Sequence, residues 1–262
     1  MPSLVDRTIA VLRSESDELA ELVPGLSEEQ LIGPSGASEW SVAQVLSHLG
    51  SGAEITRADF EAAVTGSPGP GGEFNQRVWD RWNALSPRDQ AAGSLEQNAA
   101  LISNLEAMSS DQRETLQVRL RFLPAPLPLA SFAGMRLTES VLHGWDVRVA
   151  LDPAAALSAD AALLIAEQLS GGLSFLSGFI GKADALSKPA VVELQGSGFG
   201  FVIADAVSLT SEVSDVTATF VGPLEAAIRL VGGRLTPKHT PDGVRVIGNV
   251  TLDDLRQVFP GY

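Results

Sequence analysis

The stretch LTESVLHGWDVRVA, residues 137–150, carries apolar side chains at helical spacing together with three polar side chains that could do chemistry. Glu139 and His143 are four residues apart. On an α-helix this spacing places both side chains on one face, about one turn or roughly 6 Å of rise apart. Asp146 continues the same stripe. The pattern predicts a helix over 131–150 that presents an acid and an imidazole to one side.

A second stretch, WSVAQVLSHL at residues 40–49, has the start signals of another helix. Ser41 can cap the helix, and Gln44 follows three residues later, as in a capping box. The helix is expected to run to about Val64. His48 lies two turns inside it, so its ring can face the same interior as the first stretch if the two helices are neighbours.

The N-terminal part of the chain has the periodicity of a helical bundle. Amphipathic patterns cover residues 3–22 and, with a pause at Ser86-Pro87, residues 74–108. The segment 118–130 contains three prolines and is expected to be an extended crossover. Together with the two stretches above, these patterns predict a metal-binding four-helix bundle over residues 1–152.

After Asp152-Pro153 the pattern changes to short runs that alternate apolar and polar residues, as half-buried antiparallel strands do. The fold class is therefore predicted as α+β: a helical bundle followed, over residues 153–262, by a small α+β domain with an antiparallel sheet. The elements expected in this domain are strands at 191–196, 199–206, 216–222 and 244–247 and helices at 158–178, 223–230 and 252–259.

The composition excludes several classes of function. The formal net charge of -14, with no long basic block, disfavours binding to nucleic acid or to anionic membranes. Charges interrupt the first residues, and no long uncharged apolar stretch occurs, so a cytoplasmic protein is expected. The chain has no cysteine, which excludes disulfides, cysteine-ligated metals and a protein thiol nucleophile.

Only three histidines are present, and two of them lie on the predicted bundle helices. His48, Glu139 and His143 form a ligand set that suits zinc and leaves a fourth position open, as a catalytic metal requires. Each part also has an ordinary explanation. Glu139 and His143 could be a solvated pair, and His48 could be a hydrogen-bonded core histidine.

The motifs at 40–49 and 137–150 together resemble the mycothiol-dependent maleylpyruvate isomerase family, within the DinB-like metal-binding superfamily. The resemblance extends over nearly the whole chain. It includes FNQRVWDRWNALSP at 74–87, VGGRLTP at 231–237 and VIGNVTLDDLRQVFPGY at 246–262. The two histidine motifs are the more specific part of the match.

The resemblance implies a zinc-type site at His48, Glu139 and His143 in a DinB-like bundle. It also implies that mycothiol, a low-molecular-weight compound, supplies the thiol that this cysteine-free chain lacks, and that the metal holds it as a thiolate. The expected partner is a small electrophilic or unsaturated substrate. Addition to its double bond, rotation and elimination would give cis–trans isomerisation, whereas release of the adduct would be S-transfer.

Three further residues are candidates for the site. Arg234 could bind a substrate carboxylate through two hydrogen bonds, or it could interact favourably with the dipole at a helix C-terminus. Asp146 could orient a ligand or bind the amine and hydroxyls of the thiol cofactor, or it could be a surface acid. Asn75 could bind the cofactor or cap a helix. Asp146 and Arg234 are thus the candidate catalytic residues, and Asn75 and Asp146 the candidate cofactor-binding residues.

The remaining notable side chains are expected to be structural. Trp79, Trp82 and Trp145 are expected in the core or a pocket wall, and His239 in a surface turn. Two other functions stay open: a non-catalytic metal or small-ligand binding module, and a zinc hydrolase that uses no thiol. The substrate would be named only by analogy.

Overall fold

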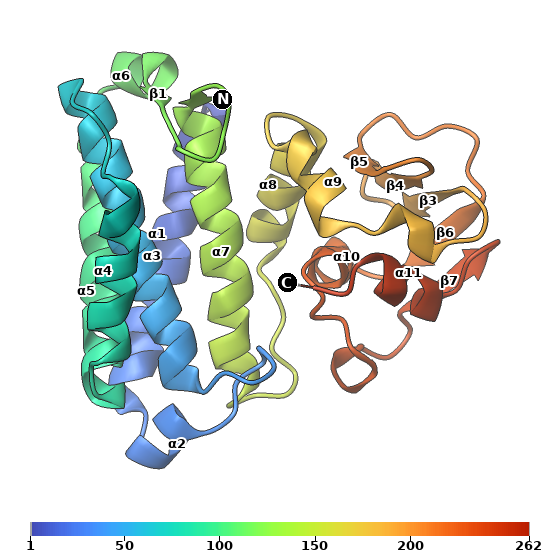
Figure 1. Cartoon of the computed structure of the whole chain (residues 1–262). Helices are drawn as coiled ribbons and strands as arrows, with labels where there is room; N and C mark the ends of the chain where they lie inside the picture. The colour runs from blue at the N-terminus through green and yellow to red at the C-terminus, as the bar shows by residue number, and fades with distance from the viewer. Residues whose placement is uncertain (1, 262) are drawn as a thin grey trace. The chain divides into compact units, whose positions relative to one another are not determined.

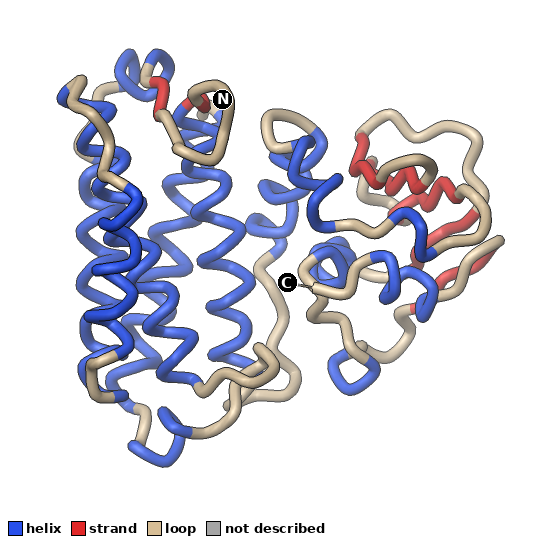
Figure 2. Tube along the Cα trace, viewed as in Figure 1, coloured by secondary structure: helices blue, strands red, loops and turns tan. Residues whose placement is uncertain are grey.

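The computed structural model describes residues 2–261. The chain divides into two compact units, Met1–Asp152 and Pro153–Tyr262, and each is treated by itself (Figures 1 and 2). The first unit is helical, whereas the second combines a sheet with short helices. This mixed α+β architecture confirms the predicted fold class.

The first unit is a four-helix bundle. Helices α1 and α7 pack together, α7 packs on α3, α3 on α5, and α5 on α1, which closes the ring (Figure 1). Shorter helices flank these four. The elements of the unit are α1 (Leu4–Leu22), η1 (Val23–Gly25), α2 (Glu28–Ile32), α3 (Val42–Thr65), α4 (Gly72–Asn83), α5 (Pro87–Glu106), α6 (Ser110–Thr115), β1 (Gln117–Val118), β2 (Leu127–Pro128) and α7 (Leu129–Val149).

The start of α3 follows the predicted capping box. The hydroxyl of Ser41 accepts a hydrogen bond from the Gln44 backbone N–H at 3.2 Å, and the Gln44 side chain accepts one from the Ser41 N–H at 2.8 Å. The helix ends at Gly66, whose φ of 68° is in the left-handed region that glycine tolerates. These two signals fix the length of α3 and therefore the depth of His48 in the bundle.

The proline-rich crossover is more regular than the sequence suggested. It forms a short antiparallel hairpin in which Gln117 pairs with Pro128 and Val118 with Leu127. Helix α7 begins directly after Pro128, two residues earlier than predicted, because a proline, which has no N–H to donate, is tolerated at the start of a helix. The short helices α2 and α6 were not predicted, since each is only five or six residues long.

Close packing of α3 depends on Gly50. A Cβ at this position would lie 2.1 Å from Cη2 of Trp82 and 2.9 Å from the Ser94 Cα on α5. Neither atom can move freely, because Trp82 is buried and the Ser94 atom belongs to the backbone. Glycine is therefore required here for the approach of α4 and α5 to α3.

The second unit contains a five-stranded sheet with strand order β5-β4-β3-β6-β7. Its strands are β3 (Ala190–Leu194), β4 (Phe199–Ile203), β5 (Val207–Thr210), β6 (Ala218–Val221) and β7 (Arg245–Gly248). Its helices are α8 (Ala159–Ser170), α9 (Ser177–Ile180), α10 (Leu224–Val231) and α11 (Leu252–Val258), with short segments η2 (Ser174–Leu176), η3 (Ala183–Ala185) and η4 (Pro237–His239).

Three features of this unit differ from the sequence prediction. Strands β3 and β6 pair in parallel, while the other three pairings are antiparallel, because alternation predicts a half-buried strand but not the direction of its neighbour. Strand β5 was missed. The helix predicted over 158–178 stops at Ser170, where Gly171 ends it, and resumes only as η2 and α9.

Within residues 2–261, no single helix is long and apolar enough to cross a membrane; only the pair Ala159–Ser170 and Ser174–Ile180, bent by 84°, meets the length and composition criteria together.

Candidate metal centre

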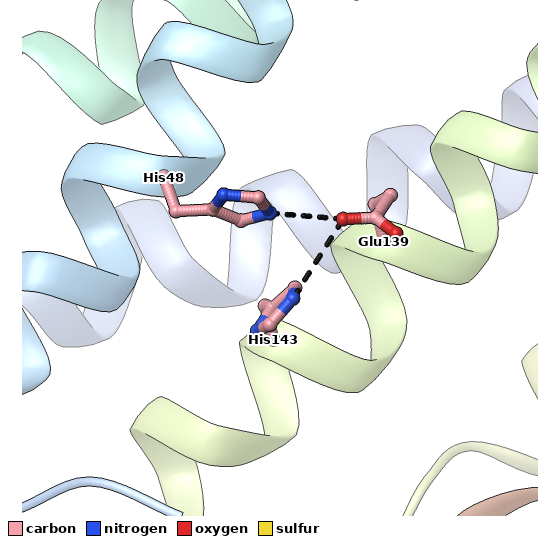
Figure 3. A group of neighbouring side chains, drawn as sticks. All are labelled: His48, Glu139 and His143. Atoms are coloured by element: carbon pink, nitrogen blue, oxygen red, sulfur yellow. Dashed lines mark hydrogen bonds and ion pairs between the residues drawn. The ribbon is translucent and has the colours of Figure 1, made fainter. Parts of the chain in front are cut away.

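Three side chains from two helices converge in the bundle (Figure 3). His48 extends from α3, and Glu139 and His143 extend from α7. The Nε2 atom of His48 lies 2.9 Å from Oε2 of Glu139, and the Nε2 atom of His143 lies 3.6 Å from the same oxygen. The potential ligand atoms of all three residues lie within 4.8 Å of one another. Two imidazoles and one carboxylate thus face a common point.

All three side chains extend from regular α-helices. Glu139 and His143 are one turn apart on α7, as their spacing predicted, and His48 is brought opposite them because α3 packs on α7. His48 and Glu139 are 91 residues apart in the sequence, yet two helices, α3 and α7, are enough to bring them together. The sequence-predicted metal-ligand candidates are therefore neighbours in the fold.

Asp146 supports His143 from behind. Its Oδ2 atom lies 2.9 Å from Nδ1 of His143, and its side chain is fully buried. The alternative of a surface acid is wrong. A carboxylate that accepts the Nδ1 proton fixes the imidazole tautomer in which Nε2 is the free ligand atom. The backbone oxygen of Asp146 also accepts a hydrogen bond from the Gly36 N–H at 2.8 Å, which ties the loop before α3 to α7.

The charge of Glu139 is maintained by its neighbours. Burial acts to raise the pKa of its carboxyl, but the hydrogen bond with His48 and the nearby His143 and Arg136 lower the pKa to about 2. Burial lowers the pKa of Arg136 to about 10, with Glu139 acting in the opposite direction. Both groups are charged at neutral pH, so Glu139 offers a carboxylate rather than a carboxylic acid to the site.

The indole ring of Trp40 lines one side of the cluster. The Trp40 ring lies 5.2 Å from the His48 ring and 6.0 Å from the His143 ring, measured between centroids, and is stacked on the latter. His143 is buried, but the side chains of His48 and Glu139 are 37% and 35% exposed. The side chains of His48 and Glu139 are therefore accessible to a small molecule from solvent.

The donor set fits a divalent transition metal. Imidazole nitrogen and carboxylate oxygen are ligands that zinc accepts, and a site with three protein ligands leaves room for a fourth from solvent or substrate. The carboxylate of Asp146 behind His143 is the kind of supporting partner that such sites have. Among residues 2–261, His48, Glu139 and His143 form the group of three or more histidine and carboxylate side chains whose ligand atoms lie close enough together to hold a metal ion.

The other predicted site residues belong to other elements of the chain. Asn75 is partly buried in the first turns of α4 and is not its cap, because the N-cap residue is Gly71. Arg234 belongs to the second unit, where it is buried and its Nη1 donates to the Gly232 carbonyl at 2.7 Å, at the C-terminal end of α10. His239 is in the short turn η4, as expected.

The tryptophan predictions hold only in part. Trp82 and Trp145 are buried, with 4% and 0% exposure, but Trp79 is 43% exposed and is not a core residue. Trp40, the first residue of the stretch that starts α3, contacts the cluster. Nothing in its spacing from His48 distinguishes the two roles.

Sequence reasoning also missed Arg136. This residue lies on α7, three positions before Glu139, and it is 4% exposed. The three-residue spacing was visible in the sequence and places both side chains on one helix face. An arginine at that spacing is usually read as a surface ion-pair partner, so its burial was not anticipated.

Comparisons with known proteins agree with this architecture. The family model described as the mycothiol maleylpyruvate isomerase N-terminal domain matches residues 12–148, just over half of the chain. Two solved structures, of the mycothiol-dependent maleylpyruvate isomerase and of a histidine-to-alanine mutant of it, are similar over 95% of this chain and 98% of theirs. Their TM-scores are 0.65 and 0.66 at 16% and 15% identity, which shows a shared fold. No curated protein matches the chain in sequence.

Proposed function

Because the chain belongs to the family defined by the mycothiol maleylpyruvate isomerase N-terminal domain, we propose that it is a metal-dependent enzyme that uses a low-molecular-weight thiol, mycothiol, on a small electrophilic substrate. The reaction is cis–trans isomerisation of an activated double bond, or transfer of the sulfur to the substrate. Zinc is the proposed metal. Maleylpyruvate is named for the related structures, and the substrate of this chain is not taken from them.

The observation that carries the proposal is the convergence of His48, Glu139 and His143 on one point, with ligand atoms within 4.8 Å of one another. This is the minimal protein contribution to a catalytic zinc site with an open position. When bound, the metal would lower the pKa of a coordinated thiol so that the thiolate, the nucleophilic form, is available at neutral pH.

Each residue in and around the cluster has a defined part in this proposal. His48 and His143 would bind the metal through Nε2, and Glu139 through a carboxylate that is already ionised. Asp146 is a positioning residue, since it reaches the metal only through Nδ1 of His143. Trp40 lies against the two imidazoles on one side.

The absence of cysteine supports the choice of an external thiol. No residue of this chain can supply sulfur as a nucleophile, so sulfur chemistry at this site needs a small-molecule thiol. Asn75 and Arg234 remain proposed contacts, for the thiol cofactor and for a substrate carboxylate respectively. A cytoplasmic location, where such thiols are kept reduced, is part of the proposal, and no nucleic-acid or membrane partner is proposed.

The first test is the metal content of the purified full-length protein by elemental mass spectrometry. Wild type is compared with His143→Ala and with His239→Ala, a matched histidine outside the cluster. We expect close to one zinc per chain in wild type and His239→Ala, and a loss of at least tenfold in His143→Ala. The metal-loaded sample is then titrated with mycothiol in a calorimeter, and we expect saturable binding that disappears when the metal is removed.

Turnover completes the test. Zinc-loaded protein with mycothiol is offered activated cis alkenes, and the products are identified by NMR, so that isomerisation and sulfur transfer are distinguished. Metal uptake that His143→Ala does not reduce, or thiol binding that is independent of metal, would contradict the proposal. Binding of both without any turnover would point to a binding module of the same fold.

A further inference from the structure

The loop between α2 and α3 is closed by its own hydrogen bonds. It covers residues 33–41, and Pro34 and Ser41 form an isolated antiparallel bridge near its two ends. Inside it, the backbone N–H of Ser35 donates to the Trp40 carbonyl at 3.1 Å, and the Ser35 hydroxyl donates to the same oxygen at 2.8 Å. We call this segment the 33–41 loop. Its closure fixes the backbone of Trp40 relative to the rest of the segment.

The 33–41 loop also contains a strained residue. Glu39 has a φ of 69°, in the left-handed region that residues other than glycine rarely adopt. Such a conformation persists only where the surrounding structure determines it, and it is common at functional sites. Ala37 packs against a hydrophobic cluster of the bundle on one side of Glu39, and Trp40 makes its ring contacts on the other. These contacts hold the loop in place.

The 33–41 loop rests on α7 at Gly36. The backbone N–H of Gly36 donates to the Asp146 carbonyl at 2.8 Å. A Cβ at Gly36 would lie 2.6 Å from Cγ1 of Val149 and 2.9 Å from both Cα and Oδ1 of Asp146. A Cβ atom does not approach other atoms so closely, and the Cα of Asp146 belongs to the helix backbone. The contact therefore requires glycine for reasons of space, since the φ of Gly36 is not in the left-handed region.

Asp146 and Trp40 contact the same imidazole. Oδ2 of Asp146 lies 2.9 Å from Nδ1 of His143. The ring of Trp40 is stacked on the His143 ring, with the centroids 6.0 Å apart and an interplanar angle of 21°. One of these neighbours belongs to the 33–41 loop, and the other is the residue on which Gly36 rests. The position of the loop on α7 therefore affects His143 both at its edge and at its face.

We propose that Gly36 is a positioning residue of the cluster, because it allows the 33–41 loop to rest directly on α7. This contact holds the carboxylate of Asp146 at Nδ1 of His143, with Nε2 of the ring facing the cluster. It also holds the ring of Trp40 against the same imidazole. A carboxylate at Nδ1 determines the tautomer and the orientation of a ligand histidine. That the imidazole binds a metal rests on the proposed function, whereas its tautomer is a property of the metal-free protein.

The first test measures the tautomer of His143 without any metal. Full-length, metal-free protein is labelled with ¹⁵N-histidine, and long-range ¹H–¹⁵N NMR spectra are recorded at alkaline pH, where imidazole is neutral. The chain has three histidines, and His143→Ala identifies the signal. Wild type should show the Nδ1–H tautomer, and Gly36→Ala should increase the share of the Nε2–H tautomer at least threefold, because the added methyl group displaces the Asp146 carboxylate. Gly25→Ala, at an exposed glycine with nothing within 4 Å of the added Cβ, should behave as wild type.

The second test asks whether Gly36 acts through Asp146. Zinc affinity is measured by competition with a chelator for Gly36→Ala, for Asp146→Asn and for the double variant. Gly36→Ala alone should weaken zinc binding about tenfold. In the Asp146→Asn background the same substitution should change the affinity less than twofold, because two residues that act through one contact are not additive. A substitution that only destabilised the bundle would give additive effects.

Three results would overturn the inference: an unchanged tautomer in Gly36→Ala, an unchanged zinc affinity, or additive effects of the two substitutions. If Gly36→Ala does not fold, Ser35→Ala decides, because it removes the hydroxyl that closes the 33–41 loop and adds no atom. We expect Ser35→Ala to shift the tautomer in the same direction, and no shift would overturn the inference. A protein that takes up no zinc would refute the proposed function, while the tautomer of the metal-free protein would still test the role of Gly36.

Discussion

The Nδ1 atom of His143 lies 2.9 Å from Oδ2 of Asp146, while Nε2 of the same ring faces Glu139 at 3.6 Å. One imidazole thus has a supporting side and a binding side, and the buried carboxylate determines which is which. Loss of that carboxylate should affect the metal without removing any ligand.

Replacing Asp146 tests this relationship. Asp146→Asn keeps the shape of the side chain but removes its charge, so His143 is held less firmly in the required tautomer. We expect zinc affinity to fall by about 10- to 100-fold, the usual effect of losing such a partner. Competition with a chromogenic chelator measures it. Asp111→Asn, on exposed α6, is the control, and equal affinities in the two variants would show that Asp146 has no positioning role.

Trp40 should report on occupancy of the cluster. Its indole lies against both imidazoles, so binding of a cation to them changes the surroundings of this ring more than those of the other tryptophans. Titration with zinc is expected to change the intrinsic fluorescence. Trp40→Phe should abolish most of this change, and Trp79→Phe, at an exposed position of α4, should preserve it. A response that survives Trp40→Phe would place the metal elsewhere.

Gly50 should tolerate no side chain. A methyl group there overlaps the ring of Trp82 and the backbone of Ser94, so Gly50→Ala overpacks the contact between α3 and its neighbours. We expect the free energy of unfolding of the first unit to fall by about 1–3 kcal/mol. Calorimetry of the full chain, with Gly178→Ala as the matched control, measures the shift of the transition. Unchanged stability would mean that α3 and α5 can separate at little cost.

Asp59 predicts a dependence of stability on pH. Burial raises the pKa of its carboxyl to about 6, although the nearby Arg121 acts to lower it. The folded chain therefore binds a proton that the unfolded chain releases from about pH 4 upward, so the contribution of Asp59 to stability is present at low pH. It declines as the pH rises from about 4 to 6 and is constant above that.

The comparison with Asp59→Asn isolates this contribution. The amide carries no charge to bury, so above pH 6 the variant should be more stable than wild type by about 1 kcal/mol after allowance for solvent screening. The difference should vanish below pH 4. Urea unfolding at a series of pH values provides the measurement, and parallel curves for the two proteins would show that Asp59 titrates normally.

The sequence was most informative where spacing alone determines position. Glu139 and His143 must share a helix face if residues 131–150 are helical, and the capping box at Ser41 and Gln44 determines where His48 lies along α3. The structure brings these three side chains together, and their role as metal ligands is a prediction for the experiments above.

The spacing of residues in the sequence was less informative where contacts between distant elements determine burial or strand pairing. The burial of Arg136 and the approach of its guanidinium to Gly52 depend on how closely α3 and α7 pack, which neither helix specifies separately. The parallel pairing of β3 with β6 likewise depends on a crossover between distant segments rather than on the alternation within either strand. Both misses concern pairs of elements, whereas most single elements were predicted well.

The cluster joins His48 to a partner 91 residues later in the chain. A metal ion bound there would act as a removable cross-link that closes a long loop, in a protein that has no cysteine with which to form a permanent one. At a free metal concentration of one hundred times the dissociation constant, such a ligand stabilises the folded state by about 2.7 kcal/mol. The resistance of the bundle to unfolding would then follow the supply of metal in its surroundings.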